Sequence, residues 1–446
     1  MSLIYKIKST FLSPTDKALW LLALPMIFSN ITVPLLGLVD TAVIGHLDSP
    51  YYLGGVAVGA MVTSFLFMLL LFLRMSTTGL TAQALGAKDN VRLARAFVQP
   101  FLLALIAGVL IFLFRHPLIS LALQIVGGSQ AVLQQAQIFL SIRWYSAPAS
   151  LANLVILGWL LGIQYVRAPV IMLIAGNLLN VILDLWLVVG LGWNVKGAAV
   201  ATVCSEYATL ALGLWLVSIV MRRRGITWLM LKQAWRGNLR KLFALNRDIM
   251  LRSLLIQLCF ASLTVIGARL GSQTVAVNAV LMNLLTFTAF ALDGFAYAVE
   301  AHSGQAFGAK DKSQLLKVWH AACRQAGLVA VGFAIVYAVA GEQIVNLLTS
   351  LPELRALADR YLGWQIVLPL VGVWCYLLDG MFIGATRGKE MRNSMAVAAA
   401  GYALTLLTLP LLHNHALWLA VAVFLSLRGL ALGWVWRQHW RRDSWF

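Results

Sequence analysis

Long apolar runs alternate with short polar breaks along the whole chain. A helix needs about 20 consecutive apolar residues to cross the hydrocarbon core of a bilayer, and twelve runs approach or exceed this length. They lie at residues 18–44, 52–82, 96–115, 138–163, 168–190, 196–221, 247–270, 274–303, 318–340, 360–385, 394–412 and 415–436. The pattern predicts an all-α integral membrane protein with twelve transmembrane helices.

The two halves of the chain resemble each other at a constant offset of 222 residues. The segment AQALGAKD at 82–89 returns as GQAFGAKD at 304–311, and VIG at 43–45 returns at 265–267. Two glycines of the fourth run keep the same register with two of the tenth: Gly158 and Gly162 pair with Gly380 and Gly384. The chain is therefore predicted to be a six-helix unit repeated once.

Six spans per repeat is an even number, so both repeats insert with the same orientation, related by an axis along the membrane normal. We expect two pseudo-symmetric six-helix lobes. The N-terminal lobe is expected at 1–221 and the C-terminal lobe at 247–446, joined by a basic cytoplasmic linker at 222–246.

Composition and charge agree with a membrane protein. Hydrophobic residues make up 61% of the chain and charged residues 11%, whereas a soluble domain carries about 25% charged residues. A net charge of +18 would suggest nucleic acid in a soluble protein. Here Lys and Arg gather in alternate loops, as cytoplasmic loops do, so we expect no nucleic-acid partner and place both termini in the cytoplasm.

Motifs for covalent or metal chemistry are not found in the sequence. There is no HExxH, no GxSxG and no CxxC, and the four cysteines lie singly inside apolar runs. We expect no metal site and no cofactor, which argues against an intramembrane enzyme.

Polar groups in the N-terminal half lie at similar predicted depth in three spans. Asp40 lies in the first span and Asp184 in the fifth, where Asn180 precedes Asp184 by four residues. Thr202 and Glu206 share the same spacing in the sixth span. Residues four apart lie on one helical face, so a polar cavity inside the N-terminal lobe is predicted.

The repeat sharpens this prediction because the acidic cluster occurs in one half only. At the offset of 222, the four positions meet uncharged residues: Asp40 meets Ser262, Asn180 meets Tyr402, Asp184 meets Leu406 and Thr202 meets Phe424. Ionisable groups inside a bilayer are costly and are functional candidates by default. We predict a cation-coupling site, with hydrogen bonding between helices as the alternative for Asn180 and Thr202.

Candidates for a substrate cavity are more scattered. Asp379 in the tenth span and Asp293 in the eighth are expected to line the substrate path, or instead to pair with an Arg; Glu206 has the same two interpretations. Met61 and Phe287 would add an adaptable apolar wall, unless they face lipid or pack between helices.

The first span contains two prolines. Pro25 and Pro34 each remove a backbone donor and favour a kink. We predict that a bend of this helix acts as a conformational switch that responds to protonation of Asp40.

Several segments resemble the multidrug and toxic compound extrusion (MATE) family, most closely its DinF branch. They are LPMIFSNITVPLLGLVDTAVIGHL at 24–47, GNLLNVILDLWLV at 176–188 and the paired GAKD segments. The resemblance implies two six-helix lobes with a V-shaped cleft and alternating access in a secondary transporter. It also implies a monomer in the bacterial inner membrane that exports small molecules by using a proton or sodium gradient.

In the DinF branch, the residues that match Asp40, Asn180, Asp184 and Thr202 are implicated in cation coupling. The chain departs from the NorM branch, which bears an acid in span seven, although Asp379 resembles a tenth-span acid of that branch. Two alternatives stay open on the sequence: sodium in place of protons, and a lipid-linked precursor flippase of the same superfamily.

Overall fold

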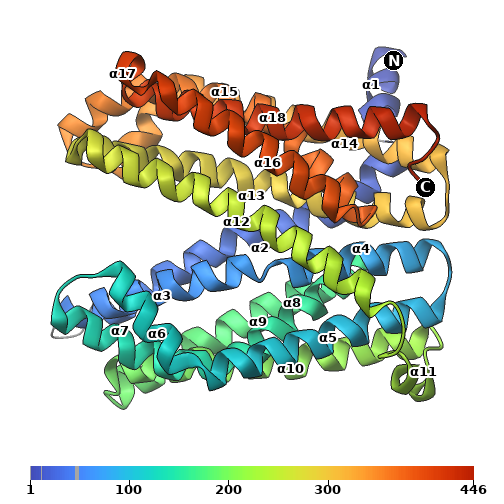
Figure 1. The fold of residues 1–446 in the computed structure, drawn as a ribbon, viewed down its shortest axis with the longest axis horizontal. Helices are drawn as coiled ribbons and strands as arrows, with labels where there is room; N and C mark the ends of the chain where they lie inside the picture. Colours follow the sequence, from blue (N-terminus) through green and yellow to red (C-terminus); the bar gives the residue numbers. More distant parts are fainter. Residues whose placement is uncertain (1, 12, 46–49) are drawn as a thin grey trace. The chain divides into compact units, whose positions relative to one another are not determined.

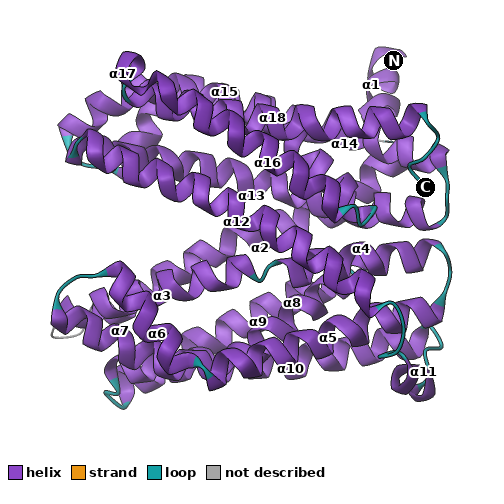
Figure 2. Cartoon of the chain, viewed as in Figure 1, coloured by secondary structure: helices purple, strands orange, loops and turns teal. Residues whose placement is uncertain are grey.

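The computed structural model describes residues 2–11, 13–45 and 50–446. Within these ranges, the side chains of residues 2, 8–11, 32–42, 44, 45 and 50 are left out of the description. No strand occurs among the residues described, and helices joined by short turns make up nearly all of them (Figure 2). The expected all-α class is confirmed.

The helical elements, labelled in Figure 1, follow in chain order. They are α1 (Ser2–Phe11), α2 (Pro14–Gly45), α3 (Pro50–Leu69), α4 (Phe72–Gly86), α5 (Asn90–Leu113), α6 (Arg115–Val126), α7 (Gln130–Arg143), η1 (Trp144–Ser146), α8 (Ala147–Gly162), α9 (Arg167–Asp184), η2 (Leu185–Gly190), α10 (Asn194–Arg223), α11 (Trp228–Gln233), α12 (Leu239–Leu270), α13 (Ser272–Gly308), α14 (Lys312–Leu348), α15 (Pro352–Gly384), α16 (Gly388–Thr405), η3 (Leu406–Thr408), α17 (Leu409–Leu412) and α18 (Asn414–Arg441).

Twelve helices span the membrane. Eleven spans are long and apolar enough among the residues described, from Tyr51–Gly86 to Asn414–Arg441. The twelfth is α2, whose 32 residues extend over about 48 Å at 1.5 Å per residue. Some spans are built from more than one element. The second span, for example, joins α3 to α4 through a turn at residues 70 and 71.

The chain forms two compact units. One contains residues 28–242, and the other contains residues 1–27 together with 243–446. The first 27 residues therefore pack with the C-terminal half, a division that differs from the expected lobes at 1–221 and 247–446. The reason lies in α2, where the buried carboxylate of Asp16 accepts hydrogen bonds from Arg324 and the indole of Trp20 donates to Gln325.

The expected linker at 222–246 is docked on the N-terminal helices and contains α11 and the start of α12. Gln99 of α5 donates its amide hydrogens to the carbonyl oxygens of Gly237 and Trp235. Ala234 is buried in the same core cluster as Trp159 of α8. The linker is thus held against its own lobe by backbone-directed contacts.

The repeated GAKD segments fold into the same turn in both lobes. Lys88 and Lys310 both have φ of 53°, and the next residue returns a backbone hydrogen bond to the preceding helix. Asp89 and Asp311 then cap the following helices, α5 and α14, by accepting from backbone N–H groups of the first turn. An aspartate at this position satisfies donors that a helix start leaves open, which explains why the motif recurs.

The paired glycines let two helices approach closely in each lobe. A Cβ on Gly158 would lie 2.5 Å from the carbonyl oxygen of Arg74, and one on Gly380 would lie 2.7 Å from that of Ala296. Arg74 and Ala296 are themselves related by the offset of 222. The structure therefore repeats at the level of backbone contacts, between α4 and α8 in one lobe and between α13 and α15 in the other.

Candidate functional site

The predicted coupling cluster lies on α9 and α10 of the N-terminal lobe. The hydroxyl oxygen of Thr202 lies 3.5 Å from Oδ1 of Asn180 and 3.1 Å from the carbonyl oxygen of Ala198. Asp184, one helical turn beyond Asn180, is only 2% exposed. The structure thus brings Asn180 and Thr202 together and buries the carboxylate on the same face of α9.

The helix geometry changes directly after Asp184. The α-helical hydrogen bonds end there, and Leu185–Gly190 continue as a π-helix, η2. In the C-terminal lobe, α16 ends at Thr405 and continues as the 3-10 segment η3. Since Leu406 is the repeat partner of Asp184, both lobes interrupt the helix at the same place, and π-helical turns are frequent at functional sites.

The C-terminal lobe shows what the repeat-equivalent positions look like without charge. The hydroxyl groups of Ser262 and Tyr402 are hydrogen bonded at 2.9 Å. The rings of Tyr402 and Phe424 are in edge-to-face contact with centroids 6.1 Å apart. These three residues are the repeat partners of Asp40, Asn180 and Thr202, and aromatic packing replaces the polar cluster.

Two predicted residues of the first span have side chains outside the described residues. Asp40 and Pro34 fall within α2, but only the helical path of their backbone is described. The side chain of Pro25 is described and half-buried, and α2 is assigned as one continuous helix through both prolines. The predicted coupling role of Asp40 and the predicted switch stay predictions.

Glu206 belongs to a buried ion-pair network between three helices. Its carboxylate accepts a hydrogen bond of 3.1 Å from the amide of Asn153 on α8 and lies 3.9 Å from the guanidinium of Arg143 on α7. Sequence reasoning did not single out Arg143, although an arginine inside an apolar span was visible. The network ties α10 to its neighbours.

Asp379 is paired with two arginines inside the C-terminal lobe. Nη2 of Arg252 on α12 and Nη2 of Arg428 on α18 each donate to the same oxygen, Oδ2, at 2.6 Å. All three residues are buried, and their formal charges sum to +1. We name these residues the Asp379 triad. Sequence reasoning weighed an Arg partner for Asp379 but did not identify these two, and the available signal was an arginine inside a predicted span.

The other predicted cavity residues lie nearer the surfaces of the lobes. Asp293 on α13 is half-buried and acts electrostatically on Tyr376 and Cys375 of α15. Met61 on α3 and Phe287 on α13 are both exposed within the chain. These exposures fit either a cavity wall or a lipid-facing surface, so their assignment to a substrate cavity stays a prediction.

Comparisons with known proteins agree with this architecture. The model of the family described as MatE matches residues 25–186 and 249–412, one segment in each half of the chain. DNA damage-inducible protein F of Escherichia coli (strain K12) is 74% identical over 98% of this chain and 95% of its own. Multidrug export protein MepA of Staphylococcus aureus (strain MSSA476) is 24% identical over 84% of this chain and 83% of its own.

A solved structure supports the fold. The MOP superfamily transporter from Pyrococcus furiosus superposes with a TM-score of 0.83 at 20% sequence identity, covering 98% of both chains. At this identity the likeness establishes the arrangement of helices within a common fold.

Proposed function

The chain belongs to the MatE family of membrane transporters, and from this premise we propose that it exports small organic molecules in exchange for protons. As a family member it is a multi-pass membrane transporter and not an enzyme. The proposed substrates are cationic or amphipathic compounds, in line with the export of multiple drugs that the name of the Staphylococcus aureus relative states. An ion gradient would drive transport without any cofactor.

The observation that carries the proposal is the burial of Asp184 beside the Asn180–Thr202 hydrogen bond. A carboxylate transferred from water into an apolar lobe favours its neutral, protonated form. Hydration of the site in another conformation would favour release of the proton. The amide and hydroxyl groups supply hydrogen-bonding partners that accommodate either protonation state, since each can donate or accept.

The internal repeat supports adding Asp40 to this cluster. Its repeat partner Ser262 contacts Tyr402, the partner of Asn180. If the two lobes share their helix packing, as the glycine contacts indicate, position 40 belongs beside Asn180. We therefore propose Asp40 and Asp184 as the two proton-carrying groups, with Asn180 and Thr202 as their hydrogen-bonding partners.

The remaining parts of the proposal concern the setting. We propose that the protein acts as a monomer in the bacterial inner membrane with both termini in the cytoplasm. Asp293, Met61 and Phe287 are proposed to line the substrate path. Asp379 and Glu206 are already engaged with arginines and would influence substrates through the charge of those networks.

The test is proton–substrate exchange in proteoliposomes that contain a pH-sensitive dye, with ethidium as the exported cation. We expect Asp184→Asn and Asp40→Asn each to lower ethidium-dependent proton movement at least tenfold while the proteins still insert and fold. Asp359→Asn is the matched control, because it removes an exposed carboxylate of α15.

Two outcomes would contradict the proposal. Exchange at the wild-type rate in both Asp184→Asn and Asp40→Asn would exclude coupling through these carboxylates. Ethidium export driven by a sodium gradient, with no response to a pH gradient, would reassign the coupling ion.

A further inference from the structure

The basic end of the C-terminal lobe has the features of a surface at the lipid–water boundary. Three tryptophans form a chain of ring contacts there: Trp319 lies 5.6 Å from Trp436, and Trp436 lies 5.5 Å from Trp440. Trp434, on α18, is 64% exposed. Tryptophan is enriched where hydrocarbon meets the headgroups, and α18 ends a turn later with Arg441 followed by Arg442.

The last four residues fold back and seal this end of the lobe. Trp445 is almost fully buried and packs edge-on against Phe382, with ring centroids 5.1 Å apart. Arg387 covers the Trp445 ring and donates to the carbonyl oxygens of Ser444 and Trp445. The C-terminal segment is thus fixed, and the neighbouring surface keeps a defined shape.

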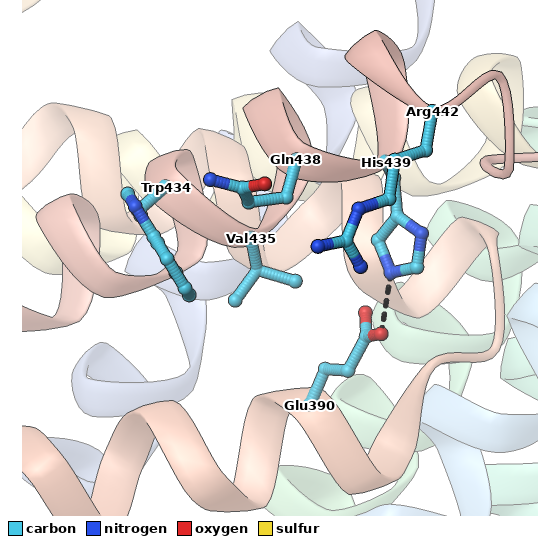
Figure 3. A pocket seen from close by; sticks show the side chains of 6 residues that line it. All are labelled: Glu390, Trp434, Val435, Gln438, His439 and Arg442. Carbon is cyan, nitrogen blue, oxygen red and sulfur yellow. Dashed lines mark hydrogen bonds and ion pairs between the residues drawn. The ribbon is translucent and has the colours of Figure 1, made fainter.

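Beside this segment lies a surface hollow of about 360 Å³. It is lined by Glu390 of α16 and by five residues of α18 and its end: Trp434, Val435, Gln438, His439 and Arg442 (Figure 3). Figure 3 shows Glu390 facing His439 across the hollow, with Trp434 at the opposite end of the group from Arg442.

The charges around the hollow leave a positive excess. The Glu390 carboxylate is bonded to Nε2 of His439 at 2.5 Å and lies 3.6 Å from Nη1 of Arg387. The other ring nitrogen of His439 is held by Ser444. Arg442, by contrast, forms no ion pair with any residue in the described part of the chain, so its charge is available to a ligand.

The lining residues also follow the order of groups in a phospholipid. Trp434, Gln438 and Arg442 are spaced by four residues on one face of α18. Eight residues of helix extend over about 12 Å, from the exposed aromatic ring to the guanidinium group. An acyl chain would meet Trp434 and Val435, the ester region would meet Gln438, and the phosphate would meet Arg442.

We propose that this hollow binds the headgroup of an anionic phospholipid. Arg442 holds the phosphate through charge-assisted hydrogen bonds, and Gln438 donates to the ester or headgroup oxygens. A net negative headgroup fits because Glu390 already has two cationic partners and leaves no acceptor site for an ammonium group. Binding of this lipid would hold the ends of α16 and α18 together and does not depend on which substrate is exported.

The test is native mass spectrometry of the purified full-length protein with added palmitoyl-oleoyl phosphatidylglycerol. We expect one retained lipid per wild-type chain and at least a tenfold lower retention in Arg442→Ala. Arg441→Ala is the matched control, since it removes the same charge one residue away from the hollow and should retain the lipid. A second variant, Gln438→Ala, should weaken retention without changing the charge.

Folding is checked independently by the thermal unfolding of each variant without added lipid, which should match that of the wild type. Equal loss of lipid in Arg441→Ala and Arg442→Ala would overturn the proposal, because it would show attraction to surface charge alone. Equal retention of phosphatidylethanolamine would overturn the selection for negative headgroups. Displacement of the lipid by millimolar inorganic phosphate would show a site for a free anion.

Discussion

Asp184 and Asp379 are both carboxylates inside the membrane, yet their partners differ. Asp379 accepts from two guanidinium groups, whereas Asp184 lies a helical turn from a neutral amide–hydroxyl pair. Two adjacent cations hold a carboxylate in its ionised form, so the Asp379 triad is suited to permanent charge. The environment of Asp184 is the better one for a group that must gain and lose a proton.

The charge balance of the Asp379 triad leads to a prediction at this scale. Asp379→Asn leaves two buried guanidinium groups uncompensated, and loss of one partner of a buried pair costs about 3–5 kcal/mol. Arg252→Met instead leaves a one-to-one pair between Arg428 and Asp379. We expect Asp379→Asn to lower the unfolding temperature in detergent far more than Arg252→Met. Equal destabilisation by the two variants would contradict the importance of the charge balance.

Whole helices are positioned by close backbone approach as much as by apolar side chains. Gly158 and Gly162 admit α4 against α8, and Gly380 and Gly384 admit α13 against α15. Small residues at helix interfaces serve this purpose in membranes, where burial of apolar surface gives little drive for association. The second element-scale feature is the interruption after Asp184 and Thr405, which re-aims the following residues in both lobes.

The glycine contacts predict a clear contrast between alanine variants. In Gly158→Ala and Gly380→Ala, the new methyl group meets a backbone carbonyl that cannot rotate away, and overpacking typically costs about 1–3 kcal/mol. Gly332→Ala in α14 meets no atom within 4 Å and gains up to about 1 kcal/mol of helix propensity. Thermal unfolding should therefore fall in the first two variants and hold or rise in the third; a fall in all three would exclude a packing effect.

For the whole molecule, the repeat and the charge distribution determine the arrangement in the membrane. Both lobes carry their GAKD turns at the same point after the second span of each repeat, capped by Asp89 and Asp311. The lysines of these turns belong to the basic set of loops, and the chain ends in Arg441 and Arg442. An even number of spans then returns the C-terminus to the side of the N-terminus.

Topology can be tested with fusions to reporter proteins. Because basic loops remain in the cytoplasm, green fluorescent protein fused after Phe446 should be fluorescent, and alkaline phosphatase at the same place should be inactive. A fusion after Gly192, between η2 and α10, should show the opposite behaviour. Active phosphatase at the C-terminus would reverse the predicted orientation.

The sequence alone determined the features that depend on local or periodic signals. Run lengths gave the twelve spans, and identical short motifs gave the repeat, because apolar length and turn chemistry are written in contiguous residues. The break inside the second span, at residues 70 and 71, and the π-helix after Asp184 were not predicted. Hydrophobicity is uniform across such breaks, so an apolar run carries no signal for them.

Only the tertiary structure decided which polar groups meet. Arg252 and Asp379 lie 127 residues apart, and Arg324 and Asp16 lie 308 apart. Partners of this kind depend on which faces of distant helices pack together, and composition or spacing within one span does not encode this. For the same reason the sequence placed the first 27 residues with the following spans, whereas buried contacts join them to the C-terminal unit.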